Sequence, residues 1–123
     1  MSGNKIFVDT NILLYFLNGE KEVIEILFEK EIIISFITEL ELLSFPELSP
    51  TSEKIIVSLL NNCSIKNIST RIKSLAIETR KNFGLKLPDA IIAATALDLN
   101  IPLITADKQF GRVDPLEVIL YTF

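Results

Sequence analysis

Short apolar segments alternate along this chain with segments in which apolar residues recur at helical spacing, and this alternation constrains the fold most. Residues 32–36 are apolar almost throughout, as a strand is when both faces of a parallel sheet are covered. The expected strands are residues 5–9, 32–36, 64–68, 103–107 and 118–121. Strands that alternate with helices in this way predict an α/β domain with a mainly parallel five-stranded sheet and helices on both faces.

Capping residues and helix breakers set the limits of the expected helices. Asp9-Thr10-Asn11 precedes the first helical pattern, and Asn18-Gly19 closes it. Pro88 suits the first turn of a helix rich in small residues, which we expect to be central. The expected helices are residues 12–17, 23–28, 38–45, 53–61, 71–83 and one that starts near Pro88. The second is expected to present one apolar face, made of Val23, Ile24, Leu27 and Phe28.

The chain is 123 residues long, which suits one domain, and we expect that domain to span residues 1–123. Its apolar runs are shorter than the roughly 18 residues that a membrane-spanning helix needs. The first residues lack the charged, apolar and small-residue pattern of a secretory signal. We therefore expect a cytoplasmic protein with no membrane partner.

The composition narrows the possible chemistry. Because the chain has no histidine, it cannot use a Ser-His or Cys-His nucleophile pair, a histidine base or a histidine-bound zinc ion. Its single cysteine, Cys63, excludes an intrachain disulfide and a cysteine-cluster metal site. An enzyme of this composition depends on carboxylates and a metal ion, or on a lysine or serine mechanism without histidine.

Four carboxylates fall where an α/β fold can form a site, beyond the carboxyl ends of its strands. Asp9 and Asp107 end expected strands. Asp89 lies in the first turn of a helix, and Glu41 lies in the short helix after the second strand. Helix capping or the helix dipole also explains each aspartate.

If the four carboxylates meet, each pair about 5 Å apart costs roughly 3 kcal/mol at an effective dielectric constant of about 20, so the cluster must protonate or bind a cation. All-oxygen ligation favours Mg²⁺ or Mn²⁺.

Glu41 is the most informative of these acids. On a helical wheel it falls between Ile37 and Phe45, and a carboxylate among apolar residues usually has a partner. Glu39 has similar apolar flanks, so periodicity alone does not choose between the two glutamates.

Four segments together resemble the acidic motifs of PIN-domain ribonucleases in order and spacing. They are Val8-Asp-Thr-Asn11, Ile37-Thr-Glu-Leu-Glu-Leu-Leu43, Leu87-Pro-Asp-Ala-Ile-Ile-Ala-Ala-Thr-Ala96 and Leu103-Ile-Thr-Ala-Asp107. The resemblance covers essentially the whole chain, and it is strongest to the VapC-type toxins of bacterial and archaeal toxin–antitoxin pairs. It implies a single PIN-like domain with metal-dependent endoribonuclease activity.

The resemblance also implies roles for individual residues. The catalytic metal ligands would be Asp9, Glu41, Asp89 and Asp107. In the family the second acid directly precedes Leu-Leu, which selects Glu41 and leaves Glu39 as an accessory. Asn11 would orient a carboxylate, and Thr105 would hydrogen-bond a ligand or a water molecule. The chain departs from the family after its last acid, because Lys108-Gln109-Phe110 stands where many relatives have a further Asp or Asn.

The implied cofactor is Mg²⁺ or Mn²⁺, and the implied substrate is RNA, hydrolysed by an activated water to leave 5′-phosphate and 3′-hydroxyl ends. The implied protein partners are a small VapB-like antitoxin, whose C-terminal tail covers the site, and a second copy of the chain. A mean hydropathy of +0.42 is high for a small monomer, which also favours a homodimer. We expect its surface to lie around Leu13 to Phe28 and Ile55 to Leu60.

Charge is unevenly distributed along the chain. The net charge of −4 argues against non-specific coating by nucleic acid. The second half nevertheless carries a basic stretch, which is either a solvated helix face or a set of phosphate contacts. The possible RNA contacts in it are Arg71, Lys73, Arg80, Lys81 and Lys86.

Three other functions stay open at this point. The first is a PIN-like RNA-processing nuclease outside a toxin system. The second is a receiver-like signalling domain, which fits poorly because such a domain needs two adjacent acids after its first strand and another acid near Ile68. The third is an inactive interaction protein with a PIN-like fold.

Overall fold

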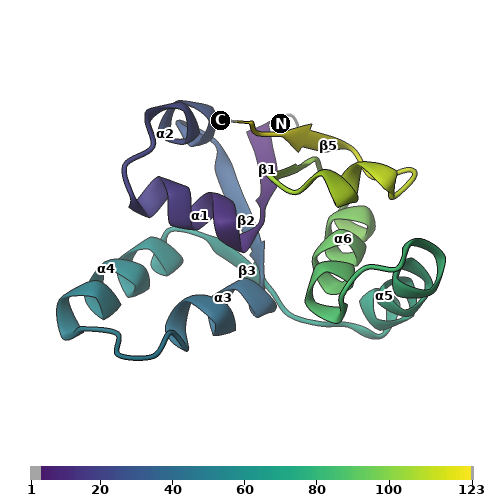
Figure 1. Ribbon diagram of the computed structural model, residues 1–123, viewed down its shortest axis with the longest axis horizontal. Coiled ribbons are helices and arrows are strands. Elements are labelled where there is room, and N and C mark those ends of the chain that lie inside the picture. Colours follow the sequence, from purple (N-terminus) through teal and green to yellow (C-terminus); the bar gives the residue numbers. More distant parts are fainter. Residues whose placement is uncertain (1–3, 123) are drawn as a thin grey trace.

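Five parallel strands form the centre of the computed structural model, which describes residues 4–122 (Figure 1). They are β1 (Lys5–Val8), β2 (Glu31–Ser35), β3 (Ser64–Lys66), β4 (Leu103–Thr105) and β5 (Val118–Leu120). Their order is β3-β2-β1-β4-β5, and each neighbouring pair is parallel. The predicted five-stranded parallel sheet is therefore confirmed. The ends of the expected domain, residues 1–3 and 123, lie outside the described residues.

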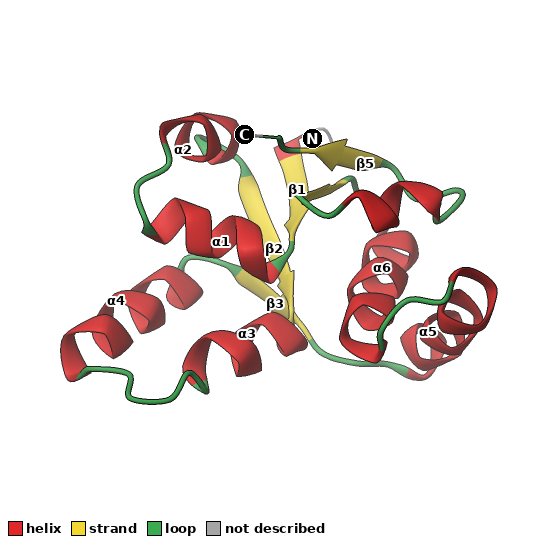
Figure 2. Cartoon of the chain, viewed as in Figure 1, coloured by secondary structure: helices red, strands yellow, loops and turns green. Residues whose placement is uncertain are grey.

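The helices cover both faces of the sheet, as predicted (Figure 2). They are α1 (Thr10–Leu17), α2 (Lys21–Leu27), α3 (Phe36–Leu43), α4 (Pro50–Asn61), α5 (Thr70–Phe83), α6 (Leu87–Leu99) and the 3-10 helix η2 (Lys108–Arg112). Helices α1, α2 and α4 lie on one side of the strands, and α5 and α6 lie on the other (Figure 2). No helix within residues 4–122 is long and apolar enough to cross a membrane.

The central strand β1 joins the two halves of the core. Its Val8 side chain packs with Leu13 of α1, whereas Phe7 faces the opposite layer and packs with Ala93 of α6. Residues 90–96 of α6 are all buried, because their small and apolar side chains let the helix fit between the sheet and α5. The prediction that this small-residue helix is central is confirmed.

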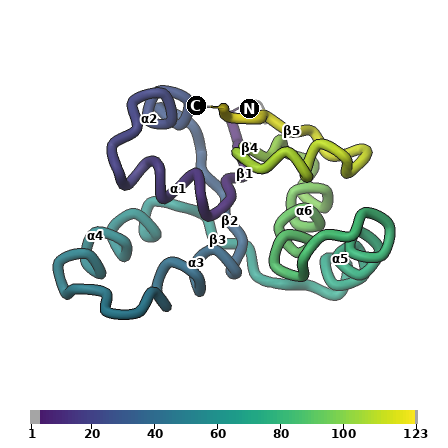
Figure 3. The backbone as a smooth tube through the Cα atoms, viewed as in Figure 1, coloured from purple at the N-terminus to yellow at the C-terminus, as the bar shows by residue number. Residues whose placement is uncertain are grey.

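The chain order explains where a site can form. From β1 the chain moves outward through β2 to β3, and it then returns past β1 to build β4 and β5 on the other side (Figure 3). The direction of winding thus reverses beside β1, and the carboxyl ends of β1 and β4 border this switch point. Open α/β sheets bind their ligands at such a point.

Several predicted limits are wrong in detail: α4 starts at Pro50 rather than at residue 53, and α3 ends at Leu43 rather than at residue 45. Helix α3 starts at Phe36 rather than Thr38, because the Ser35 hydroxyl accepts a hydrogen bond from the Ile37 backbone N–H (3.1 Å) and caps the helix directly after β2. The apolar face expected for the second helix is narrower than predicted. Helix α2 ends at Leu27, and Phe28 lies beyond it with 70% of its surface exposed.

Candidate active site

Carboxylates from three separate elements line one cavity at the carboxyl end of β1. The cavity has a volume of about 180 Å³. Asp9 follows β1, Glu41 comes from α3, and Asp89 comes from the first turn of α6. The other lining residues are Thr10, Asn11, Leu14, Phe45 and Ile92. The structure therefore brings together acids that are 32 and 48 positions apart in sequence (41 − 9 and 89 − 41).

Both carboxylate oxygens of Asp9 accept hydrogen bonds that fix its orientation. Its Oδ1 accepts a hydrogen bond from the Ile12 backbone N–H (3.0 Å) and so caps α1. Its Oδ2 accepts a hydrogen bond from the Thr105 hydroxyl. Only 6% of the residue surface is exposed, and this burial raises the pKa of Asp9 above its ordinary value, with further contributions from Asp89 and Asp107. The ionised form of Asp9 is therefore costly unless a positive charge is present.

Asp89 lies in a similar electrostatic environment. Partial burial is the main factor that raises the pKa of Asp89, and the negative charges of Asp107 and Glu41 raise it further. Lys86 and a hydrogen bond from Gln109 act in the opposite direction. The repulsion expected if the acids meet thus acts on Asp89 from two of them, Asp107 just beyond β4 and Glu41 on α3.

Asp107 lies just beyond β4, beside this cavity's aspartates. Its backbone N–H donates to the Thr105 hydroxyl (3.1 Å), and its Oδ1 accepts from the Gln109 backbone N–H (3.0 Å), which caps η2. The Thr105 hydroxyl therefore contacts both Asp9 and Asp107. Thr105 thus lies between two of the acids, where it could take the supporting role that the resemblance implies.

Glu41 has a partner, as its place among apolar residues predicted. Its side chain is exposed, and the partner is the Thr10 hydroxyl, 2.6 Å from Oε1. The same hydroxyl is hydrogen-bonded to Thr38 (3.0 Å). Glu39 does not line the cavity, so the geometry favours Glu41 as the second acid. Thr10 was not singled out from the sequence, although its place between Asp9 and Asn11 was a usable signal.

The five basic residues predicted as RNA contacts do not lie together in the structure. Lys86 is close enough to Asp89 to lower its pKa. Arg71 forms an ion pair with Asp98 of α6 (2.6 Å), a pairing that was not predicted from the sequence. Lys73, Arg80 and Lys81 line a separate cavity of about 530 Å³ along α5 and α6. Of the five residues proposed from the sequence as RNA contacts, all within the described part of the chain, only Lys86 has a recorded interaction with an acid of the cavity.

The donor set of the acidic cavity suits a hard cation. Within residues 4–122, no three acidic side chains, as they stand, are grouped closely enough to hold a metal ion. The polar side chains that line the cavity are nevertheless three carboxylates, one hydroxyl and one amide, all of which carry an oxygen that can ligate a metal ion. The negative charges of the aspartates also repel one another, which a cation would relieve. The residues that could hold Mg²⁺ or Mn²⁺ are Asp9, Glu41, Asp89 and Asp107, because both ions prefer carboxylate oxygens.

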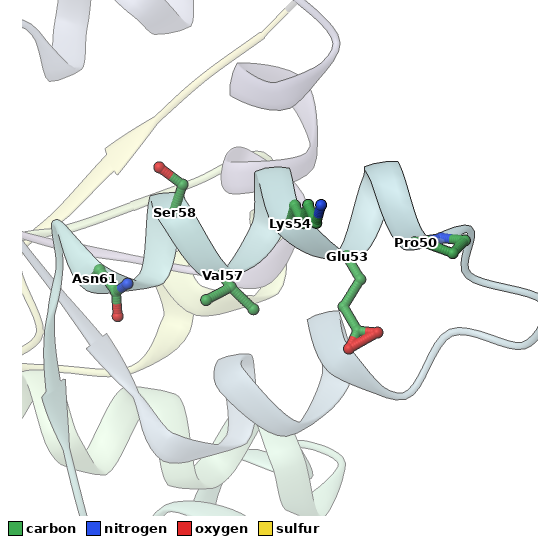
Figure 4. A pocket seen from close by; sticks show the side chains of 6 residues that line it. All are labelled: Pro50, Glu53, Lys54, Val57, Ser58 and Asn61. Atoms are coloured by element: carbon green, nitrogen blue, oxygen red, sulfur yellow. The ribbon is translucent and has the colours of Figure 1, made fainter.

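A larger hollow, of about 490 Å³, lies on the outer face of α4 and is a poorer candidate (Figure 4). All of its lining residues come from this one helix: Pro50, Glu53, Lys54, Val57, Ser58 and Asn61. No second element contributes a side chain, so the polar groups of this hollow do not converge on a common point. In the acidic cavity, by contrast, polar groups from several elements do converge.

The family model of the PIN domain matches residues 6–116, so this chain belongs to the PIN domain family. It is 32% identical to ribonuclease VapC2 of Methanocaldococcus jannaschii, over 97% of this chain and 95% of that protein. The solved structures with similar folds include the following two. A chain of a toxin–antitoxin complex from Klebsiella pneumoniae matches with a TM-score of 0.82 and 32% identity, covering 93% of this chain and 95% of that one. A chain of VapBC-1 from nontypeable Haemophilus influenzae matches with a TM-score of 0.79 and 26% identity, covering 94% and 97%. The resemblance predicted from the four motifs is confirmed, and the receiver-like alternative is excluded.

Proposed function

We propose that this protein is a metal-dependent endoribonuclease and the toxin of a VapBC-type toxin–antitoxin pair, acting on RNA in the cytoplasm. The observation that carries the proposal is the single cavity lined by Asp9, Glu41 and Asp89 at the switch point of the sheet. A relative with 32% identity that is named a ribonuclease, and solved relatives in toxin–antitoxin complexes, support it. The chain has no histidine, so carboxylates and a cation are the chemistry that its composition permits.

A bound Mg²⁺ or Mn²⁺ would activate a water for in-line attack on the phosphodiester and stabilise the leaving 3′ oxygen. The residues of this chain position the reaction. Thr105 fixes the orientation of Asp9, and Thr10 does the same for Glu41. Asn11 lines the cavity and can orient a carboxylate or a phosphate oxygen. Lys86, beside Asp89, can neutralise a phosphate at the rim. Arg71, Lys73, Arg80 and Lys81 are proposed as more distant RNA contacts.

The surface next to the acidic cavity supports an antitoxin partner. A second cavity, of about 240 Å³, shares Leu14 and Phe45 with the acidic one. Its wall is mainly apolar and includes Leu17 and Ile55. A chain segment that lays apolar side chains in this cavity could extend an arginine or lysine toward the carboxylates. This is the arrangement proposed for the C-terminal tail of the antitoxin.

Expression of the protein alone is expected to slow bacterial growth, because free toxin would cleave cellular RNA. Co-expression of the small protein encoded beside it is expected to restore growth. The measurement is the growth curve together with the integrity of total RNA, with Asp9→Asn as the inactive control. Normal growth and intact RNA at high expression of the parent would contradict the toxin assignment. RNA cleavage in vitro without an effect on growth would favour a PIN nuclease outside a toxin system.

We also propose a homodimer, although the structure changes the surface available for it. Leu13, Val23, Ile56 and Leu60, all within the expected surface, belong to the core and cannot contact a second copy. The exposed apolar residues that remain there are Ile24, Phe28, Ile55 and Val57. A second exposed apolar group lies on the α5 and α6 side and consists of Ile68, Ile77 and Leu87.

Sedimentation is expected to give a dimer at micromolar concentration. Phe28→Asp is expected to weaken it at least tenfold, because Phe28 is the most exposed apolar residue of the first group and burying a charge in an interface costs several kcal/mol. Ile77→Asp, 60% exposed on the other side, is the matched control and should leave the dimer intact. A dimer lost with Ile77→Asp and kept with Phe28→Asp would move the interface to α5 and α6, and a monomeric parent would refute the proposal.

A further inference from the structure

The amide of Gln109 connects two of the site's carboxylates. Gln109 lies in η2, and its Nε2 is 2.7 Å from Asp107 Oδ2 and 3.3 Å from Asp89 Oδ2. Its backbone N–H also donates to Asp107 Oδ1 (3.0 Å). The two aspartates come from different elements, α6 and the end of β4, and Gln109 is the side chain that is hydrogen-bonded to both.

An amide nitrogen is well suited to this position. It carries two protons, and each can be directed at a different carboxylate. It therefore brings together two negative groups that repel each other, without adding charge of its own. In this arrangement, Gln109 does by hydrogen bonding what a bridging cation would do by ligation.

The same geometry makes Gln109 a competitor of the cation. An amide NH₂ group is a donor only, so Nε2 cannot ligate a metal ion. An ion that bridged Asp89 Oδ2 and Asp107 Oδ2 would have to take the place between these oxygens that Nε2 holds, hydrogen-bonded to both. Gln109 would have to release both, by moving away or by turning its Oε1 toward the ion. An acidic residue at this position would instead add a ligand and a negative charge.

We propose that Gln109 is a positioning residue that holds Asp89 and Asp107 together in the metal-free protein and weakens the binding of a divalent ion by occupying their oxygens. This inference rests on the proposed function only in taking the two aspartates as ion ligands. It concerns ion affinity, so it can be tested without RNA.

The test is calorimetric titration of the full chain with MnCl₂, together with thermal melting in EDTA. Gln109→Met keeps the length of the side chain but removes both donors. It is expected to lower the melting temperature in EDTA and to bind Mn²⁺ a few-fold more tightly than the parent. Gln109→Glu also removes the donors and adds a charge, and it should bind Mn²⁺ about tenfold more tightly or better. Asn61→Asp, on the outer face of α4, adds a charge remote from the cavity and should match the parent.

An Mn²⁺ affinity of Gln109→Met equal to or weaker than that of the parent would overturn the proposal, because it would make Gln109 a bystander or a ligand. An unchanged affinity of Gln109→Glu would overturn it as well, and this variant serves if the methionine variant does not fold. Either of these two results would overturn only the role of Gln109. The proposed function would still hold if the parent binds Mn²⁺ and cleaves RNA. A parent that binds no Mn²⁺ would overturn both the metal site and this inference.

Discussion

Replacing Asp9 with asparagine is expected to abolish RNA cleavage while leaving the metal-free protein as stable as the parent or more stable. Asparagine can keep the cap on Ile12, because Asn and Asp cap helices about equally well. The substitution also removes a buried negative charge that is repelled by Asp89 and Asp107. The expected gain is between zero and about 2 kcal/mol in the free energy of unfolding. Thermal melting in EDTA measures it.

A divalent ion should reverse this order of stability. An ion about a hundredfold above its Kd stabilises the folded parent by about 2.7 kcal/mol, or roughly 10 °C for a domain of this size, and it should stabilise Asp9→Asn less. Because folding raises the pKa of Asp9, the ionised carboxylate lowers the free energy of unfolding of the parent at neutral pH. This cost disappears as the pH falls toward the ordinary value of 3.8, where Asp9 becomes protonated. Without a metal ion, the stability advantage of Asp9→Asn over the parent should therefore shrink in the same direction. Equal responses of both proteins to Mn²⁺, with cleavage retained, would reduce Asp9 to a helix cap.

Glu41→Gln is expected to lower the rate of RNA cleavage about a hundredfold or more, whereas Glu39→Gln keeps the parent's rate within a few-fold. The two glutamates are neighbours on α3, and Glu41 lines the acidic cavity whereas Glu39 does not. A neutral amide keeps the hydrogen bond from Thr10 but removes the charge that a cation needs. The measurement is the initial rate on one RNA substrate for both variants and the parent. A larger loss of cleavage rate for Glu39→Gln than for Glu41→Gln would show that Glu39, and not Glu41, is the second acid.

The placement of the aspartates was predictable because it follows from local rules. Asp9 was expected at the end of a strand, and the structure has it directly after β1, where it caps α1. The parallel sheet then brings the ends of β1 and β4 to the same edge. These features depend on short-range capping and on the chirality of α/β connections, both of which a single sequence carries.

The environment of Glu41 could not be derived in the same way. Its apolar neighbours on α3 predicted that the carboxylate has a partner, but they did not indicate which residue that partner is. Its hydrogen bond with Thr10 spans 31 positions, and the contact of Gln109 with Asp89 spans 20. Such pairings depend on how separate elements pack, which helical periodicity does not specify.

The most direct test of a metal-dependent nuclease site is digestion of a structured RNA by the purified protein, followed by analysis of the ends of the products. With Mn²⁺, the parent is expected to give fragments with 5′-phosphate and 3′-hydroxyl ends. EDTA, or the Asp9→Asn protein purified in the same way, is expected to leave the RNA intact. Cleavage that persists in EDTA, that is equally fast with Asp9→Asn, or that leaves cyclic phosphate ends would contradict the carboxylate and metal mechanism.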